Sequence, residues 1–180
     1  MEFNHTGDRL IIAGSGKVAL NIYKIAAILG YNITVIDHRA ETLTLERFPE
    51  ASELLLGDVV ELLENCDIDE TTSIVLVTHD HEFDKPALEA IIKSPARYIG
   101  VLGNKRKVTT YFNNLQLMEI SEELLERVHI PIGLDLGGKL ATEIALAAMA
   151  EIQAVKYGRP GGFVTIKYAS KGNEKHEELF

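Results

Sequence analysis

The sequence predicts an α/β fold, in which a doubly wound, mostly parallel sheet of Rossmann type forms a single domain. Short runs of consecutive apolar residues alternate with segments of helical spacing, which is typical of parallel strands covered by helices on both faces. A glycine-rich turn, Gly14 to Ala19, joins the first run to the first helix. The length of 180 residues fits one domain. We expect this domain over residues 1–170, followed by a mobile polar tail over 171–180.

The first part of the chain supplies three predicted strands. Arg9–Ala13 is an apolar run that enters the glycine turn, and apolar residues at positions 18, 22, 25 and 29 then predict a helix that ends at Gly30. Ile33–Ile36 is a β-branched run and predicts the second strand. Glu53–Leu56 predicts a third strand, and a helix is expected over Val59–Asn65.

Two more strands follow, with a helix between them. Ser73–Val77 and Arg97–Leu102 are apolar runs and predict the fourth and fifth strands. Between them, Asp84 suits a helix N-cap, Pro86 falls in the first turn, and the apolar pattern continues through Ile92.

Helical spacing predicts three further helices, over Lys105–Leu115, Glu122–Val128 and Leu140–Tyr157. The last of these is rich in alanine, and such a face allows another element to approach closely. Core packing is the simpler use of this face, and a homodimer contact is the other. Gly162–Tyr168 predicts one more strand.

The composition excludes several classes of protein. The net charge of −9 argues against a nucleic-acid binder, although the segment 41–70 alone holds ten acidic residues and only Arg47 as a base. That segment is either a solvated face or a docking surface for a partner. The single cysteine, Cys66, excludes a disulfide framework and a cysteine-rich zinc site. No apolar run reaches the ~18 residues of a membrane helix, and the polar start Met1–Asp8 is no signal peptide. We therefore expect a cytoplasmic protein.

The glycine turn indicates a dinucleotide site. The segment Gly14–Ala19 matches the pattern G-x-G-x-x-G/A after a strand and before a helix, so a pyrophosphate would lie at the helix N-terminus. Asp37 ends the next strand, where an acid takes the ribose hydroxyls of NAD. Arg39 stands two residues further on and suits the 2′-phosphate of NADP, or an ion pair with Glu41 or another local acid. The choice between NAD and NADP stays open.

A histidine-rich loop, Thr78–Asp84, follows the fourth strand. Ligands of open α/β sheets bind at the carboxyl ends of strands, so this loop belongs to the functional edge. His79 and Asp80 are the candidates for acid–base chemistry. The spacing of His79 and His81 resembles that of metal ligands, but the His-Asp continuation of metallo-hydrolase loops is missing, and we expect no metal.

A basic turn follows the fifth strand. Gly103 and Asn104 precede three cations, Lys105 to Lys107, in the first turn of a helix, where cations oppose the helix dipole. A bound anion would reverse this cost. We therefore expect Arg106, together with Lys105, to hold a phosphate or carboxylate of a ligand, unless the turn is only solvated and pairs with the acidic segment.

One motif near the end of the chain is deceptive. Gly133–Leu140 fits G-x-x-x-x-G-K, yet Leu140 stands where a P-loop needs Ser or Thr for magnesium, so nucleotide hydrolysis is not expected. Glu143 lies near the start of the following helix, where an acid favours the dipole.

Several segments taken together resemble the Rossmann domain of the XdhC/CoxF family, the xanthine dehydrogenase accessory factors. They are Gly14–Ala19, Asp37–Arg39, Arg47–Ala51, Thr78–Asp84 (THDHEFD), Ile99–Gly103, Pro131–Asp135 (PIGLD) and Glu143–Ala145. The resemblance covers about residues 9 to 157. The chain departs from the family's pattern at Lys17, where the family has His, and at Leu140–Ala141, where it has Thr-Pro.

The resemblance implies a part in the maturation of molybdenum hydroxylases: binding molybdenum cofactor as cargo, assisting its sulfuration and delivering it to the apoenzyme. The family's N-terminal domain is not seen before the first strand, so a molybdenum hydroxylase or a separate XdhC/CoxI-type domain is the expected partner. The residues expected to bind dinucleotide or the second ligand are Gly14, Ser15, Gly16, Lys17, Val18, Asp37, His38, Arg39, Thr78, His79, Gly103, Asn104 and Arg106. The alternative is a small NAD(P)-dependent oxidoreductase with His79 as its acid–base residue, or a dinucleotide sensor.

Overall fold

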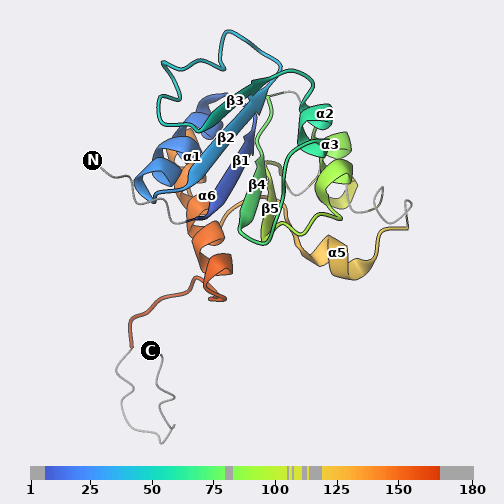
Figure 1. Cartoon of the computed structure of the whole chain (residues 1–180). Coiled ribbons are helices and arrows are strands. Elements are labelled where there is room, and N and C mark those ends of the chain that lie inside the picture. Colours follow the sequence, from blue (N-terminus) through green and yellow to red (C-terminus); the bar gives the residue numbers. More distant parts are fainter. Residues whose placement is uncertain are drawn as a thin grey trace, which may run out of the picture.

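The computed structural model describes residues 7–79, 83–104, 106, 108–110, 113 and 119–166. Six parallel strands form one sheet in the order β3-β2-β1-β4-β5-β6 (Figure 1). The strands are β1 (Arg9–Ala13), β2 (Asn32–Asp37), β3 (Glu53–Leu56), β4 (Thr72–Leu76), β5 (Tyr98–Val101) and β6 (Val128–His129). This arrangement confirms the predicted Rossmann-like α/β class.

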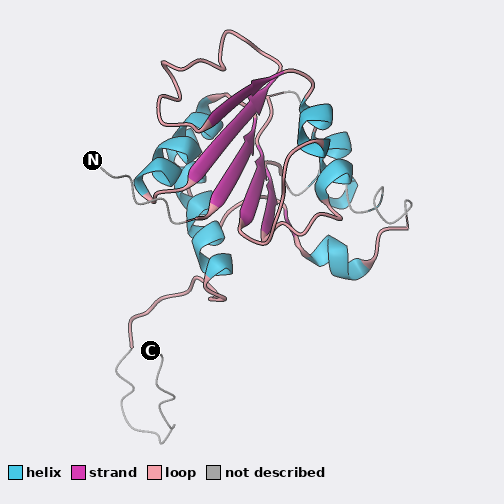
Figure 2. Cartoon of the chain, viewed as in Figure 1, coloured by secondary structure: helices cyan, strands magenta, loops and turns pink. Residues whose placement is uncertain are grey.

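Helices cover both faces of the sheet (Figure 2). They include α1 (Lys17–Ile28), α2 (Val59–Glu64), α3 (Asp84–Ile91), α5 (Glu122–Glu126) and α6 (Ala141–Lys156). Side chains of α1 and α6 share a core with alternate residues of the central strands, such as Leu10 and Ile12. The residues between them, such as Ile11, face α2 and α3 on the other side. Both faces are therefore buried, which explains the continuous apolar runs in the sequence.

The alanine-rich face of α6 serves core packing. Ala145 and Ala148 are completely buried in the core cluster that also contains side chains of α1. The other predicted use of this face, as a homodimer contact, stays a prediction.

Three local predictions were wrong. The segment Glu122–Val128 is not one helix, because Val128 pairs with Ile99 and begins the short strand β6. In the predicted strand Gly162–Tyr168, residues 162–166 form no strand and Phe163 is 95% exposed, and residues 167–168 lie outside the described residues. A β-branched run forms a strand only beside a hydrogen-bonding neighbour, and these residues have none in the described part of the chain. Asp84 is the first residue of α3, and its N-cap is Phe83.

Other predictions fall partly outside the described residues. Residues 106, 108–110 and 113 are helical, as the predicted helix over 105–115 requires, and the remainder of that helix is not described. The expected tail, 171–180, also lies outside the described residues. None of the helices in the described ranges is long and apolar enough to cross a membrane.

Candidate dinucleotide site

The glycine turn lies where β1 passes between β2 and β4, at the point where the strand order reverses. Gly14 has φ +121°, and a Cβ atom at this position would lie 2.5 Å from the carbonyl oxygen of Val77 and 2.8 Å from its carbon. Its own N–H donates to the carbonyl oxygen of Ile36 at 2.7 Å. Only glycine fits, because the backbone that follows β4 lies directly against the turn.

Gly16 has a different environment. It is the N-cap of α1 with φ −78°, and a Cβ atom here would meet nothing within 4 Å. Gly16 has no side chain that could cap the helix, and the first turn of α1 holds no acidic residue. The helix N-terminus therefore faces open space in which N–H groups and the dipole favour an anion. Such an opening fits a pyrophosphate, and Lys17 beside it is exposed.

Asp37 is held inside the protein. It is 2% exposed, and its Oδ2 accepts hydrogen bonds from the Ser15 N–H at 2.7 Å and the Ser15 hydroxyl at 2.6 Å. Arg39 donates to the same carboxylate from its N–H, Nε and Nη2, and His38 Nδ1 lies 3.3 Å from Oδ1. Burial raises the pKa of a carboxyl group, but the bonds from Arg39 and Ser15 outweigh it and lower the pKa of Asp37 to about 2.

The long loop between β2 and β3 folds back over the glycine turn, which the sequence reasoning missed (Figure 1). Thr42 shares a 2.6 Å hydrogen bond with the Ser15 hydroxyl, and Arg47 Nη2 donates to the Ser15 carbonyl oxygen at 2.9 Å. Phe48 anchors the loop, because it is fully buried and packs edge-on against Tyr23 with ring centroids 5.1 Å apart. The signal was the segment Arg47–Ala51, where the aromatic Phe48 stands between the charged residues Arg47 and Glu50.

Of the loop after β4, predicted over Thr78–Asp84, the structure describes residues 78, 79, 83 and 84. Thr78 is buried and its hydroxyl donates to the carboxylate of Asp84 at 2.5 Å. The Asp84 carboxylate is thus bonded to the loop that precedes α3. His79 is exposed. Asp80 and His81 lie outside the described residues. Among those that are described, no group of three His, Cys, Asp or Glu side chains could hold a metal.

The loop after β5 ends at the same edge of the sheet. Gly103 is half-buried and Asn104 is exposed, and the carbonyl oxygen of Asn104 accepts from the Val108 N–H at 3.3 Å as the next helix begins. Arg106 is exposed in the first turn of that helix. The fold therefore assembles the ends of β1, β2, β4 and β5 at one edge, as the sequence predicted, and the roles of these residues stay predictions.

In the P-loop-like segment, backbone N–H groups bond to a side chain of the chain itself. A carboxylate oxygen of Glu143 accepts the N–H groups of Lys139 and Leu140, both at 2.9 Å. A Cβ atom on Gly138 would lie 2.5 Å from the Cβ of Glu143. The place where a P-loop holds phosphate is thus filled by the chain's own acid.

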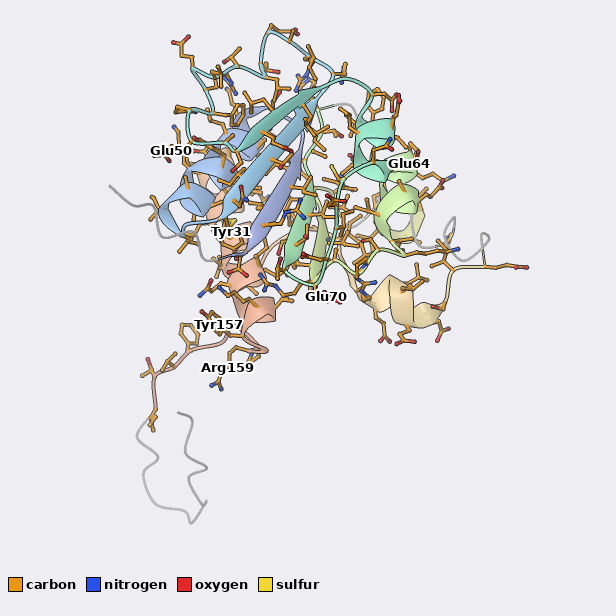
Figure 3. The ribbon with its side chains drawn as sticks, in the orientation of Figure 1. Tyr31, Glu50, Glu64, Glu70, Tyr157 and Arg159 are labelled. Atoms are coloured by element: carbon orange, nitrogen blue, oxygen red, sulfur yellow. The ribbon has the colours of Figure 1, made fainter. Side chains whose placement is uncertain are left out.

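The acidic residues of the segment 41–70 do not gather into one patch. All ten are exposed, and they are distributed over the β2–β3 loop, β3, α2 and the turn before β4. Figure 3 shows Glu50, Glu64 and Glu70 on well-separated parts of the molecule. A hollow of about 320 Å³ lies near this segment and is lined by Arg9, Glu53, Cys66 and Asp67 among others. It lies toward the amino ends of β1 and β3, away from the glycine turn.

Comparison with known proteins settles the family. A family model described as the XdhC Rossmann domain matches residues 10–152. The chain belongs to the XdhC Rossmann-domain family. A relative in Escherichia coli, named uncharacterized protein YqeB, is 35% identical over 160 residues, which is 87% of this chain and 29% of that protein.

Other relatives of this XdhC domain carry functional names. A protein of Bacillus subtilis that is named as a probable xanthine dehydrogenase subunit is 26% identical over 80% of this chain and 42% of its own length. The molybdenum cofactor insertion chaperone PaoD from E. coli is 26% identical over 82% of this chain and 40% of its own length. The crystal structure of a xanthine dehydrogenase from Bacillus halodurans superimposes with a TM-score of 0.74 and 25% identity, covering 84% of this chain and 43% of that one. The chain thus spans less than half the length of these relatives.

The PIGLD segment of this XdhC domain contacts a partly buried polar cluster. Glu151 accepts from the Tyr98 hydroxyl at 2.5 Å and from the Gly133 N–H at 3.1 Å, and His129 Nδ1 lies 3.4 Å away. The Tyr98 and His129 rings stack with centroids 4.7 Å apart. Burial raises the pKa of Tyr98 well above its usual value, and the Glu151 carboxylate adds to this. Sequence reasoning missed this cluster because its members lie on β5, β6 and α6.

Proposed function

We propose that this chain is the NAD(P)-binding Rossmann domain of an XdhC-type accessory protein, and that it serves the maturation of a molybdenum hydroxylase. The observation that carries the dinucleotide proposal is the open space over Gly16 at the uncapped N-terminus of α1. The N–H groups of the first turn would hold the pyrophosphate there, and Lys17 and Arg39 would supply positive charge. The bound dinucleotide would supply either hydride chemistry or a binding signal.

The Ser15 network would keep this turn in position before any ligand arrives. Ser15 is completely buried and is held by Asp37, Thr42 and Arg47 through hydrogen bonds of 2.6 to 2.9 Å. A turn fixed in this way loses little conformational entropy on binding, which favours affinity.

The link to molybdenum hydroxylases rests on the family and on what its members are named. PaoD is named an insertion chaperone for molybdenum cofactor, and the B. subtilis relative is named a probable xanthine dehydrogenase subunit. Because this chain spans under half of those proteins, we propose that the cofactor is cargo held jointly with a partner domain. Thr78, His79 and Arg106, at the ends of β4 and β5, would face that second ligand.

No described contact favours the alternative, a small oxidoreductase. An acid–base histidine needs a partner that orients its ring, and none of the described residues holds His79 in this way. A stand-alone oxidoreductase would change the nicotinamide absorbance with some small substrate, and we expect no such change.

Calorimetric titration with NADPH and NADH tests the dinucleotide proposal. Gly16→Val places a branched side chain in the phosphate space and should weaken binding about 10- to 100-fold, which corresponds to losing one charge-assisted hydrogen bond. Gly162→Val is the matched control, because a Cβ atom at Gly162 also meets nothing within 4 Å, away from the site. Unchanged affinity in Gly16→Val, or equal losses in both variants, would refute the phosphate assignment.

The maturation role needs a separate assay. A molybdenum hydroxylase expressed with this chain and its partner domain should carry more inserted molybdenum than the same hydroxylase expressed without the chain. An equal metal content in both preparations would contradict the role while leaving dinucleotide binding untouched.

A further inference from the structure

The ribose-binding position of this Rossmann fold is already occupied by the protein. The Asp37 carboxylate accepts five hydrogen bonds, two from Ser15 and three from Arg39, at distances of 2.6 to 3.3 Å. A carboxylate offers about four lone-pair positions. The 2′- and 3′-hydroxyls of NAD would therefore find no free acceptor on Asp37, and binding them would require breaking bonds that hold the glycine turn.

Arg39 lies beside Asp37 and carries the opposite charge. Its Nε and Nη2 hold Asp37 at 3.3 and 3.0 Å, which fixes the guanidinium at the carboxyl end of β2. The Arg39 side chain is 20% exposed, so it also reaches solvent. A planar guanidinium presents five N–H donors and can face two oxyanions at once, which a lysine cannot do in the same way.

The charges around the turn also favour a phosphate. Arg39 binds the Asp37 carboxylate and Arg47 binds the Ser15 carbonyl oxygen, so two guanidinium groups lie at the Ser15–Asp37 unit, which carries one carboxylate. The Arg47 Nε is buried, and nothing in the described part of the chain accepts its hydrogen. The carboxylates of Glu41 and Glu46 belong to the same loop but are exposed, where solvent and salt screen them.

We propose that this site takes NADP rather than NAD, with Arg39 as the specificity-determining residue that binds the 2′-phosphate. The inference rests on the proposed dinucleotide function and names the ligand for it. Asp37 then serves the turn and the arginine, and not the ribose that its position in the fingerprint suggests.

Calorimetric titration of the intact chain with NADPH and with NADH is the first test. We expect NADPH to bind about 10- to 100-fold more tightly, the effect of one or two added charge-assisted hydrogen bonds. Adenosine 2′,5′-bisphosphate should displace NADPH at concentrations where 5′-AMP does not. Equal or tighter binding of NADH would overturn the inference and leave the proposed function intact. Failure of both dinucleotides to bind would overturn the proposed function itself.

Variants at Arg39 provide the second test. Arg39→Ala should remove the preference, since it deletes the phosphate ligand and frees Asp37 for ribose hydroxyls, and Arg39→Lys should keep only part of it. Because the preference is a ratio of two affinities in one variant, partial unfolding does not alter it. Arg159→Ala is the control variant. Arg159 is exposed and lies beyond the C-terminal end of α6, at the opposite end of the molecule from the carboxyl ends of the strands (Figure 3). An unchanged preference in Arg39→Ala would refute the role of Arg39.

Discussion

The two glycines of the turn should respond differently to substitution by alanine. Gly14→Ala puts a methyl group 2.5 Å from the Val77 carbonyl oxygen and 3.0 Å from the Thr78 nitrogen, and both of these atoms belong to the backbone. Neither atom can rotate away as a side chain would. Relief requires β1 and β4 to separate, although they are paired in register from Arg9 and Thr72 onward.

The cost follows from two contributions. A φ of +121° costs a residue with a Cβ atom about 1–2 kcal/mol, and forcing an extra methyl group into a packed site costs about 1–3 kcal/mol. The free energy of unfolding should therefore fall by about 2–5 kcal/mol. In a domain of this size that lowers the melting temperature by about 4–20 °C. Gly16→Ala adds a methyl group in open space at φ −78° and should leave stability unchanged or raise it by up to about 1 kcal/mol.

Denaturant unfolding followed by circular dichroism measures both variants against the parent chain. Equal unfolding midpoints for Gly14→Ala and Gly16→Ala would refute the close approach of the Val77–Thr78 backbone as the reason for glycine at position 14.

Three further changes test separate parts of the structure. The lowered pKa of Asp37, about 2 against 3.8, contributes stability above pH 3.8 that is lost as the pH falls toward 2. This amounts to about 2–3 kcal/mol, and Asp37→Asn should flatten the acid limb of the stability curve; an unchanged slope contradicts the Ser15–Asp37–Arg39 network. Tyr98→Phe removes a buried donor to Glu151 and should lower the unfolding free energy by about 1–3 kcal/mol in denaturant titrations. An unchanged unfolding free energy would show that the hydrogen bond between Tyr98 and Glu151 does not stabilise the fold. Glu143→Ala leaves the start of α6 uncapped and should cost about 0.5–2 kcal/mol by the same measurement, with unchanged stability as the contrary result.

The strands of the sheet were predictable where helices bury both of their faces. The runs at β1, β2 and β4 are continuously apolar because helices cover both faces, so composition alone located these strands. The strand β6 is only two residues long and leaves no such run, and it forms because Val128 finds Ile99 beside it. Residues 162–166 show the reverse case, a strand-like composition without a neighbouring strand in the described ranges.

The candidate site was predictable in its place but not in its contacts. Turn and strand patterns located Gly14, Gly16 and Asp37 at one edge, because a fingerprint in a strand–turn–helix context fixes topology. No local pattern could show that Asp37 bonds to Ser15, or that Arg47 returns to the turn from 32 residues away. These contacts depend on the path of the β2–β3 loop. Asp84 likewise has the sequence of a cap, and its tertiary contact with Thr78 gives it another role.

The central claim is that a phosphate-bearing dinucleotide lies over the glycine turn. Backbone amide chemical shifts of the isotope-labelled chain, followed while NADPH is added, report on that location residue by residue. The claim predicts saturable shifts of the Gly16, Lys17 and Val18 amides, together with the Arg39 amide at the end of β2. Unchanged chemical shifts for all amides, or changes confined to the residues that line the hollow beside Cys66, would contradict the claim.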